Sequence, residues 1–212
     1  MSAACFEPEC RACPRLARYL DGIRQSHRGY HARPVPAFGD ARPRLLIVGL
    51  APGLHGANRT GRPFTGDYAG ELLYRTLHSL GLCSQPKAAH RGDGLELSGC
   101  RITNAVKCVP PENKPTADEV NTCNRYLRAE IALLPREAVL FALGGIAHRA
   151  VLKALGLSAS RYPFAHGRVH RLPEGRRLVD SYHCSRYNTQ TRRLTPQMFK
   201  RALHRAQKLA FE

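Results

Sequence analysis

The 212-residue sequence has no tryptophan, only two methionines and no long apolar run. Its longest run, AVLFALGGIA at residues 138–147, is about half of the roughly 20 residues that a membrane helix needs. The first residues, MSAACFEPEC, lack the basic and apolar segments of a secretion signal. We therefore expect a soluble, cytoplasmic protein in which residues 1–212 form one domain with a sizeable core.

Acidic residues are also scarce. The chain has 16 Asp and Glu against 33 Lys and Arg, which gives a formal net charge of +17. Such an excess favours a polyanionic partner, and nucleic acid is the first candidate. The alternative is a compositional bias toward arginine in a GC-rich genome, since only six of the 33 basic residues are lysines.

The common phosphate-binding motifs are missing, although a glycine-rich segment follows an apolar run. This segment is GLAPGLHGANRTGRPFTGD at residues 49–67. Gly56 and Gly61 have the spacing of a P-loop, but Arg62 and Pro63 stand where that motif requires Lys and Ser or Thr. The dinucleotide pattern Gly-x-Gly-x-x-Gly is absent as well. The segment is therefore expected to bring its backbone close to a different kind of ligand.

Short apolar runs alternate with helical patterns along the chain. Strands are predicted at residues 45–50, 102–106, 139–143 and 178–182, with a weaker one at 168–172. Helices are predicted at residues 68–81, 116–134, 145–156 and 195–210. This alternation predicts an α/β fold whose parallel sheet is covered on both faces and binds ligands beyond the carboxyl ends of its strands. The polar segments 51–67, 107–115 and 183–193 should therefore converge on one crevice.

Four of the eight cysteines have a spacing that suggests a metal site. Cys10 and Cys13 form a C-x-x-C pair, and Cys108 and Cys123 are separated by fourteen residues. Four thiolates can hold zinc or an iron-sulfur cluster. Zinc sites commonly use two closely spaced pairs, so the wide second spacing favours a 4Fe-4S cluster over zinc. The other four cysteines, Cys5, Cys83, Cys100 and Cys184, are expected to be ordinary buried residues that bind no ligand.

The motifs GLAPG with HGANRTGRPFTGD, TNAVKC and YHCSRYNTQTRRLT, together with the widely spaced cysteines, resemble the family 5 uracil-DNA glycosylases, the UDGb class. The likeness runs from Cys10 to about Phe199. It implies a three-layer fold with a central four-stranded parallel sheet between helices and a 4Fe-4S cluster on the four cysteines. It also implies removal of uracil and other deaminated bases from DNA. Arg192 departs from the pattern, because glycine is usual at this position.

Three side chains carry the expected recognition of the base. His183 resembles the histidine that hydrogen-bonds uracil O2 as the anion forms. Asn104 resembles the asparagine that reads the base, since an amide can donate to O4 and accept from N3–H. Phe64 is the expected stacking surface. The plain alternatives are a structural histidine, an asparagine that satisfies loop backbone, and a core phenylalanine.

The glycine-rich segment supplies the rest of the expected pocket. Backbone amides of Gly49, Leu50 and Ala51 are expected to face the carbonyl oxygen of a flipped base. Asp67 is the candidate to orient water or stabilise the sugar cation, and it is an equally good helix N-cap. His55 and Asn58 rank behind it for the same task.

The last loop, residues 185–195, is expected to press on the minor groove of DNA. The candidate DNA contacts there are Ser185, Tyr187, Asn188, Arg192 and Arg193. Lys107 and Lys114 are further candidates for phosphate contacts. We expect a monomeric, monofunctional glycosylase that uses water and leaves an abasic site. The alternatives are a non-catalytic iron-sulfur protein that binds damaged DNA and, less favoured, a redox carrier.

Overall fold

The computed structural model describes residues 6–212, so Cys5 lies outside the described part of the chain. It contains one six-stranded sheet with the order β1-β3-β2-β4-β6-β5. The strands are β1 Phe38–Gly39, β2 Leu45–Gly49, β3 Cys100–Asn104, β4 Val139–Leu143, β5 Val169–Arg171 and β6 Arg177–Ser181. The four central strands are parallel, as predicted, and the short edge strands β1 and β5 are antiparallel to their neighbours.

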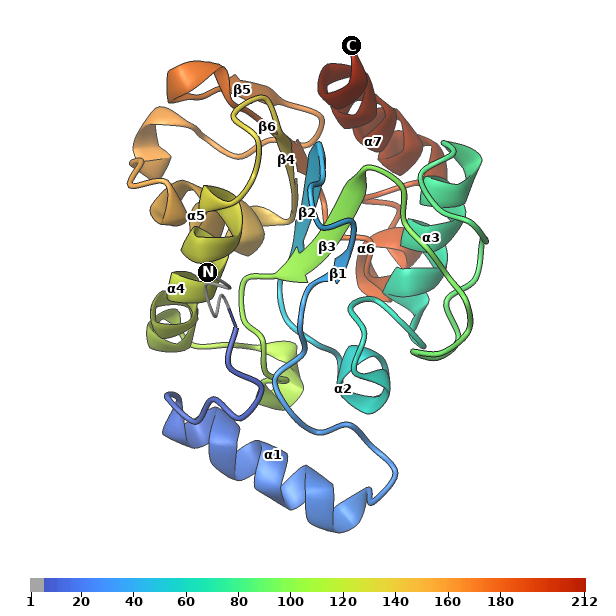
Figure 1. Cartoon of the computed structure of the whole chain (residues 1–212), viewed down its shortest axis with the longest axis vertical. Helices are drawn as coiled ribbons and strands as arrows, with labels where there is room; N and C mark the ends of the chain where they lie inside the picture. The colour runs from blue at the N-terminus through green and yellow to red at the C-terminus, as the bar shows by residue number, and fades with distance from the viewer. Residues whose placement is uncertain (1–5) are drawn as a thin grey trace.

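Helices cover both faces of the sheet (Figure 1). They are α1 Pro14–Ser26, α2 Ala57–Thr60, α3 Tyr68–Ser79, α4 Ala117–Ala132, α5 Gly145–Ala154, α6 Arg186–Gln190 and α7 Pro196–Phe211. Helices α3 and α7 pack on one face and α4 and α5 on the other, whereas α1 lies apart from the sheet. In residues 6–212, no helix combines the length and apolar character needed to cross a membrane.

The strands are buried on both sides because of this layering. Leu45 and Ile47 of β2 point into the core below α3 and α7, and Leu46 and Val48 point into the core below α4 and α5. All residues of β2 and β4 are buried. A strand covered on both faces reads as a continuous apolar run, which is why these strands could be recognised in the sequence.

Local signals explain where helix α4 begins. The Glu119 N–H donates to Thr116 Oγ1 at 3.2 Å, and the Thr116 N–H donates to Glu119 Oε2 at 2.8 Å. This capping box satisfies two N–H groups that a helix start leaves unpaired. Glu119 also accepts hydrogen bonds from Arg15 of α1 at 2.7 Å, so the same carboxylate connects α1 to α4.

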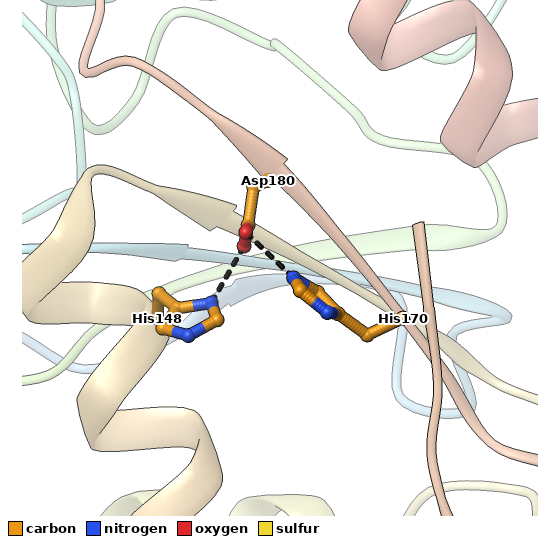
Figure 2. Close-up of side chains that lie close together, drawn as sticks. All are labelled: His148, His170 and Asp180. Atoms are coloured by element: carbon orange, nitrogen blue, oxygen red, sulfur yellow. Dashed lines mark hydrogen bonds and ion pairs between the residues drawn. The ribbon is translucent and has the colours of Figure 1, made fainter. Parts of the chain in front are cut away.

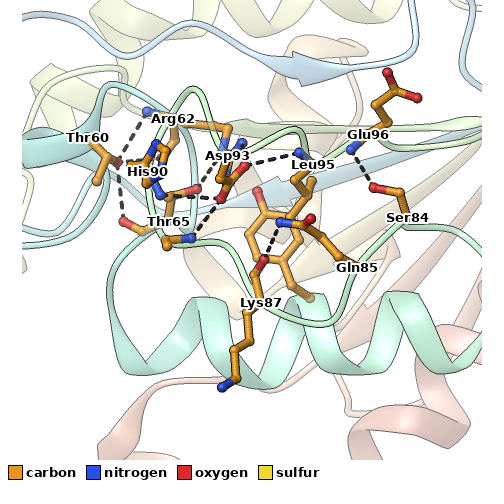
Figure 3. Close-up of polar contacts among 12 residues, drawn as sticks. Thr60, Arg62, Thr65, Ser84, Gln85, Lys87, His90, Asp93, Leu95 and Glu96 are labelled. Carbon is orange, nitrogen blue, oxygen red and sulfur yellow. Dashed lines mark hydrogen bonds and ion pairs between the residues drawn. The ribbon is translucent and has the colours of Figure 1, made fainter.

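The arginine that breaks the P-loop pattern is a structural residue (Figure 3). Both terminal nitrogens of Arg62 donate to Asp93, at 2.8 and 2.7 Å, and Arg62 Nε donates to Thr65 at 2.9 Å. The pair is buried, and the Arg62 guanidinium holds the pKa of Asp93 well below its usual range. It fastens the polar loop at residues 84–96 to the glycine-rich segment.

Candidate active site

Three segments far apart in the sequence meet at a pocket of about 610 Å³. The pocket lies beyond the carboxyl ends of the central strands, where the sequence pattern predicted a crevice. The glycine-rich segment contributes most of its wall, Asn113 comes from the segment after β3, and the loop after β6 contributes His183 and residues 185–188. Leu50, Ala51, Phe64 and Asp67 are among the lining residues.

Gly49 and Asn104 form the layer behind this pocket. They occupy paired positions at the carboxyl ends of β2 and β3. A Cβ atom on Gly49 would lie 2.6 Å from the Phe64 ring and closer still to Asn104 Oδ1. Only glycine therefore leaves room for both side chains, and the close approach of backbone to side chain explains the start of the glycine-rich segment.

Phe64 connects this layer to the histidine after β6. Its ring stacks on the His183 imidazole, with centroids 5.9 Å apart and planes inclined by 30°. Its backbone has a φ of +53°, in the left-handed region that bulky side chains rarely adopt. Such a conformation costs about 1–3 kcal/mol and is typical of functional sites.

The Asn104 side chain is buried, with 2% of its surface exposed. Its Oδ1 atom has no hydrogen-bond partner among the residues that the structure describes. An unpaired buried amide oxygen costs about 1–3 kcal/mol. The side chain can therefore accept a hydrogen bond from a ligand that reaches this layer.

His183 lies two residues after the end of β6 and lines the pocket. Burial lowers the pKa of His183 to about 4, so the imidazole is neutral at pH 7. Its backbone oxygen accepts a hydrogen bond from Asn188 Nδ2 at 2.8 Å. A neutral imidazole at this position can donate a hydrogen bond to an oxygen that becomes negatively charged.

Asp67 caps a helix with one carboxylate oxygen and turns the other toward the pocket wall. Oδ1 accepts the Gly70 N–H at 2.9 Å and caps α3. Oδ2 faces Gly53 and Gly56, where a Cβ atom on Gly56 would lie 2.7 Å from Asp67 Cγ. Burial raises the pKa of Asp67, although the N–H groups of Gly70 and Ala69 act in the opposite direction. The carboxylate is thus fixed at the pocket wall.

The segment at residues 185–195, predicted from the sequence to be a loop, contains the short helix α6. Ser185 caps α6 through the Asn188 N–H at 3.4 Å, and the Tyr187 side chain is 71% exposed. Arg192 is exposed and has a φ of +56°. Its backbone therefore keeps the left-handed conformation that glycine favours. The Arg193 guanidinium lies 4.7 Å from the centre of the Tyr182 ring.

The structure corrects one expected phosphate contact. Lys107 is 1% exposed, and its Nζ donates to Glu130 at 2.7 Å and to Thr103. A buried, paired ammonium cannot reach DNA. Lys114 remains exposed and pairs with Glu112. The prediction for Lys107 was wrong because its position one residue after a predicted strand end does not reveal which way the side chain points.

Several pocket residues were not singled out from the sequence. Asn113 lies in the segment PPENKP and has a φ of +58°. Tyr68 follows Asp67 directly, and the Arg186 guanidinium lies 5.2 Å from its ring centre. The only signal for these residues in the sequence is that each lies beside or near an expected site residue. Of the lower-ranked candidates, His55 lines the pocket and Asn58 is fully buried.

The four cysteines with metal-site spacing come together between α1, the end of β3 and α4. Cys10, Cys13, Cys108 and Cys123 line one cavity whose other walls include the apolar residues Leu16 and Val106. Burial raises the pKa of Cys123 to about 11. Two nitrogens point at sulfur atoms: the Lys107 N–H lies 3.3 Å from Cys123 Sγ, and Arg125 Nη2 lies 3.5 Å from Cys10 Sγ.

A different group has the geometry of a compact metal site (Figure 2). Among residues 6–212, only His148, His170 and Asp180 bring three donor atoms within 4.8 Å of one another. Hydrogen bonds already link them: His148 Nδ1 and His170 Nε2 contact the Asp180 carboxylate at 2.7 and 2.8 Å. His148 Nε2 donates to the Tyr162 carbonyl at 2.8 Å. Both nitrogens of His148 face acceptors, so the group is satisfied as a buried ion pair.

Comparison with known proteins agrees with this geometry. The family model described as the uracil DNA glycosylase superfamily matches residues 36–207. The chain is 52% identical over 206 residues to a type-5 uracil-DNA glycosylase of Thermus thermophilus, with 95% of this chain and 94% of that protein covered. It is 46% identical over 202 residues to the type-5 enzyme of Pyrobaculum aerophilum, covering 93% and 87%. A type-4 uracil-DNA glycosylase of the same organism is 35% identical over 143 residues, covering 67% and 65%.

Proposed function

Because the chain belongs to the uracil DNA glycosylase superfamily, and within it to the type-5 group, we propose that its pocket holds a flipped uracil and cleaves the bond to deoxyribose. The chain is a uracil-DNA glycosylase of DNA repair. The observation that supports this assignment of the pocket is the meeting of Phe64, His183 and Asp67 at one cavity, with Asn104 directly behind it.

The departing base needs stabilisation of negative charge. Uracil O2 becomes anionic as the glycosidic bond breaks, and the neutral His183 imidazole donates a hydrogen bond to it. Backbone N–H groups of Leu50 and Ala51 face the same base. Asn104 accepts from N3–H and donates to O4, a pattern that cytosine cannot match. The unpaired Oδ1 atom supports this reading role.

The sugar needs stabilisation of positive charge and a nucleophile. Asp67 Oδ2 is the carboxylate oxygen that helix capping leaves free, and it accepts a proton from water or faces the oxocarbenium-like sugar. The burial that raises the pKa of Asp67 also makes it a stronger base. We propose water as the nucleophile, so that the product is an abasic site with an intact strand.

We propose that Cys10, Cys13, Cys108 and Cys123 hold a 4Fe-4S cluster. The four thiols come from three separate segments, before α1, after β3 and within α4, whereas zinc sites commonly use two closely spaced pairs. The apolar walls and the two N–H groups aimed at sulfur also fit a cluster ligated by thiolates. When bound, the cluster supplies a covalent link between α1, β3 and α4.

Iron analysis tests the cluster proposal. The purified protein should be brown and contain about four iron atoms and four acid-labile sulfides per chain, as the cluster formula requires. Replacing Cys83 by Ser is the matched control, because Cys83 lies in another core and should leave the iron content unchanged. A colourless protein loaded with zinc would contradict the cluster and leave the glycosylase assignment intact.

We propose that the loop at residues 185–195 contacts the minor groove. Tyr187 is an exposed aromatic side chain that lines the pocket, and Arg192 is exposed near the end of the loop. Ser185, Asn188 and Arg193 complete the proposed set. Removal of other deaminated bases, a monomeric state and one domain for the whole chain are part of the same proposal.

An oligonucleotide assay tests the reaction. A labelled duplex with one U:G or U:A pair is incubated with the protein and then treated with alkali. Strand scission that appears only after alkali indicates base removal without lyase activity. Scission without alkali would contradict the water mechanism, and no product from either duplex would contradict the proposed reaction. Duplexes with hypoxanthine or xanthine test the wider substrate range.

A further inference from the structure

A second histidine, His166, contacts the backbone that carries His183. The Tyr182 N–H donates to His166 Nδ1 at 3.2 Å. The two rings also stack, with centroids 5.1 Å apart and planes inclined by 16°. We propose that His166 is a positioning residue that fixes the Tyr182–His183 backbone and thereby aims the His183 imidazole at the base. The inference rests on the proposed role of His183.

The contacts of His166 require one protonation state. Its Nδ1 accepts a hydrogen bond, so this nitrogen must carry a lone pair and the proton sits on Nε2. Burial lowers the pKa of His166, which keeps the ring neutral.

Three carbonyl groups around His183 have main-chain or local partners. The Gly144 N–H donates to the Ser181 carbonyl at 2.8 Å, and Ser181 Oγ donates to the Tyr182 carbonyl at 2.9 Å. Asn188 holds the His183 carbonyl at 2.8 Å. In contrast, the Tyr182 N–H is hydrogen-bonded by a side chain from a separate loop, that of His166.

Losing this contact should therefore move His183. Without His166 Nδ1, the half-buried Tyr182 N–H is left unpaired, and the Ser181–Tyr182 peptide is held only through its carbonyl, by the Gly144 N–H. Arg193 and Phe164 still contact the Tyr182 ring, at 4.7 and 6.0 Å, but neither bonds to its backbone. A displacement of about 1 Å in a catalytic group lowers a rate by about 100-fold.

Single-turnover kinetics with a U:G duplex test the inference. His166→Ala should lower the rate by about 10- to 100-fold. The Kd for duplex DNA should stay within about twofold of the unaltered protein, since His166 lies outside the DNA-facing rim. His166→Asn should recover most of the rate, because its Oδ1 can accept the Tyr182 N–H where Nδ1 did.

A double-mutant cycle with His183→Ala separates positioning from general damage. If His166 acts through His183, adding His166→Ala to His183→Ala should cause less than about a twofold further loss. Additive losses would overturn the inference, as would a fully active His166→Ala. If His166→Ala fails to fold, equal rates for His166→Asn and His166→Gln would overturn it, because Gln places its acceptor one bond further out.

The control is Val151→Ala, a buried change in the core below α4 and α5. It should lower the free energy of unfolding and leave the rate unchanged. If it lowers the rate as much as His166→Ala does, the effect is general destabilisation and the inference fails. An inactive unaltered protein would instead refute the proposed reaction, so the two failures are distinguishable.

Discussion

Asp67 caps a helix, and we propose that the same side chain also takes part in the reaction. One carboxylate oxygen caps α3 and the other faces the pocket wall. From the sequence, a catalytic role and a helix-capping role for Asp67 were equally supported, because an aspartate before a helix is a common N-cap. The structure explains why both fit, since each oxygen has its own surroundings.

Asp67→Asn should separate these roles. Asparagine caps helices about as well as aspartate, so the free energy of unfolding should change by less than about 0.5 kcal/mol. The single-turnover rate should fall by about 100- to 10,000-fold, because the amide cannot accept a proton. Asp67→Ala is the comparison, and it should lose the cap as well, at about 0.5–2 kcal/mol. A fully active Asp67→Asn would leave Asp67 with the capping role alone.

His183 should titrate far below an ordinary histidine. Its folded-state pKa of about 4 lies below the usual value of 6.5, so the unfolded chain takes up a proton first as the pH falls. The contribution of His183 to stability is therefore complete above pH 6.5 and declines between pH 6.5 and 4. An NMR titration of the imidazole, assigned with His183→Ala, measures the midpoint. A midpoint near 6.5 would show that the ring is solvated.

The positions of single residues could be predicted where a residue lies at the end of a central strand, although their roles remain proposals. His183 and Asn104 belong to this group, since both lie at carboxyl ends of central strands. Lys107 was wrong because the chain turns after β3, and its side chain enters the core beside Glu130. The partner is 23 residues away in sequence, and no local pattern indicates that contact.

At the level of elements, burial decided what the sequence could reveal. The central strands were found because they are continuous apolar runs, and α3, α4, α5 and α7 because each presents apolar residues to the core at helical spacing. Strand β3 begins and ends two residues earlier than predicted, at Cys100–Asn104. Its apolar continuation, Ala105 and Val106, leaves the strand and still donates to the Gly49 and Leu50 carbonyls at 2.9 and 3.0 Å.

Helices α1 and α6 were missed for physical reasons. Helix α1 buries Leu16, Ala17, Leu20 and Ile23 at helical spacing, but it packs on loops and on the cysteine cavity instead of on the sheet, so the strand–helix alternation gave no signal for it. Helix α6 has five residues, none of them buried, and is held by its Ser185 cap. An isolated helix of this length is unstable in water, so the surrounding loop contacts must stabilise it.

The ion pair behind β6 gives a prediction at the level of the strand. Asp180→Asn removes the carboxylate that His148 and His170 face, and leaves buried donors without a charged acceptor. We expect the free energy of unfolding to fall by about 3–5 kcal/mol in urea denaturation. Asp21→Asn is the control, because its pair with Arg11 is exposed and should contribute less than about 1 kcal/mol. Equal effects of the two changes would contradict a buried ion pair.

For the whole molecule, the net charge of +17 predicts strongly salt-dependent DNA binding. Each neutralised phosphate contributes about −0.9 to the slope of log K against log salt. Arg192→Gly should reduce that slope by about 0.9 in fluorescence anisotropy titrations, and it suits the left-handed backbone at this position. Arg136→Ala, near the opposite end of the strands, should leave the slope unchanged. Unchanged slopes in both variants would exclude a phosphate contact by Arg192.

The architecture as a whole was the most predictable property. The parallel centre of the sheet and the meeting of three polar segments follow from strand and helix alternation. The two antiparallel edge strands could not be anticipated fully, because β1 has two residues and β5 three. Such short segments carry almost no periodic signal, and their pairing depends on the neighbouring strand.

These brief outer strands have a consequence for behaviour at high concentration. A long outer strand without a neighbour on one side exposes a row of free N–H and C=O groups, to which extended segments of other polypeptides can bind. Here the two outer strands are only two and three residues long, Phe38–Gly39 and Val169–Arg171, and the second of them ends in an arginine. The native protein therefore offers other chains little template for cross-molecular strand addition, the first step toward fibrous assembly.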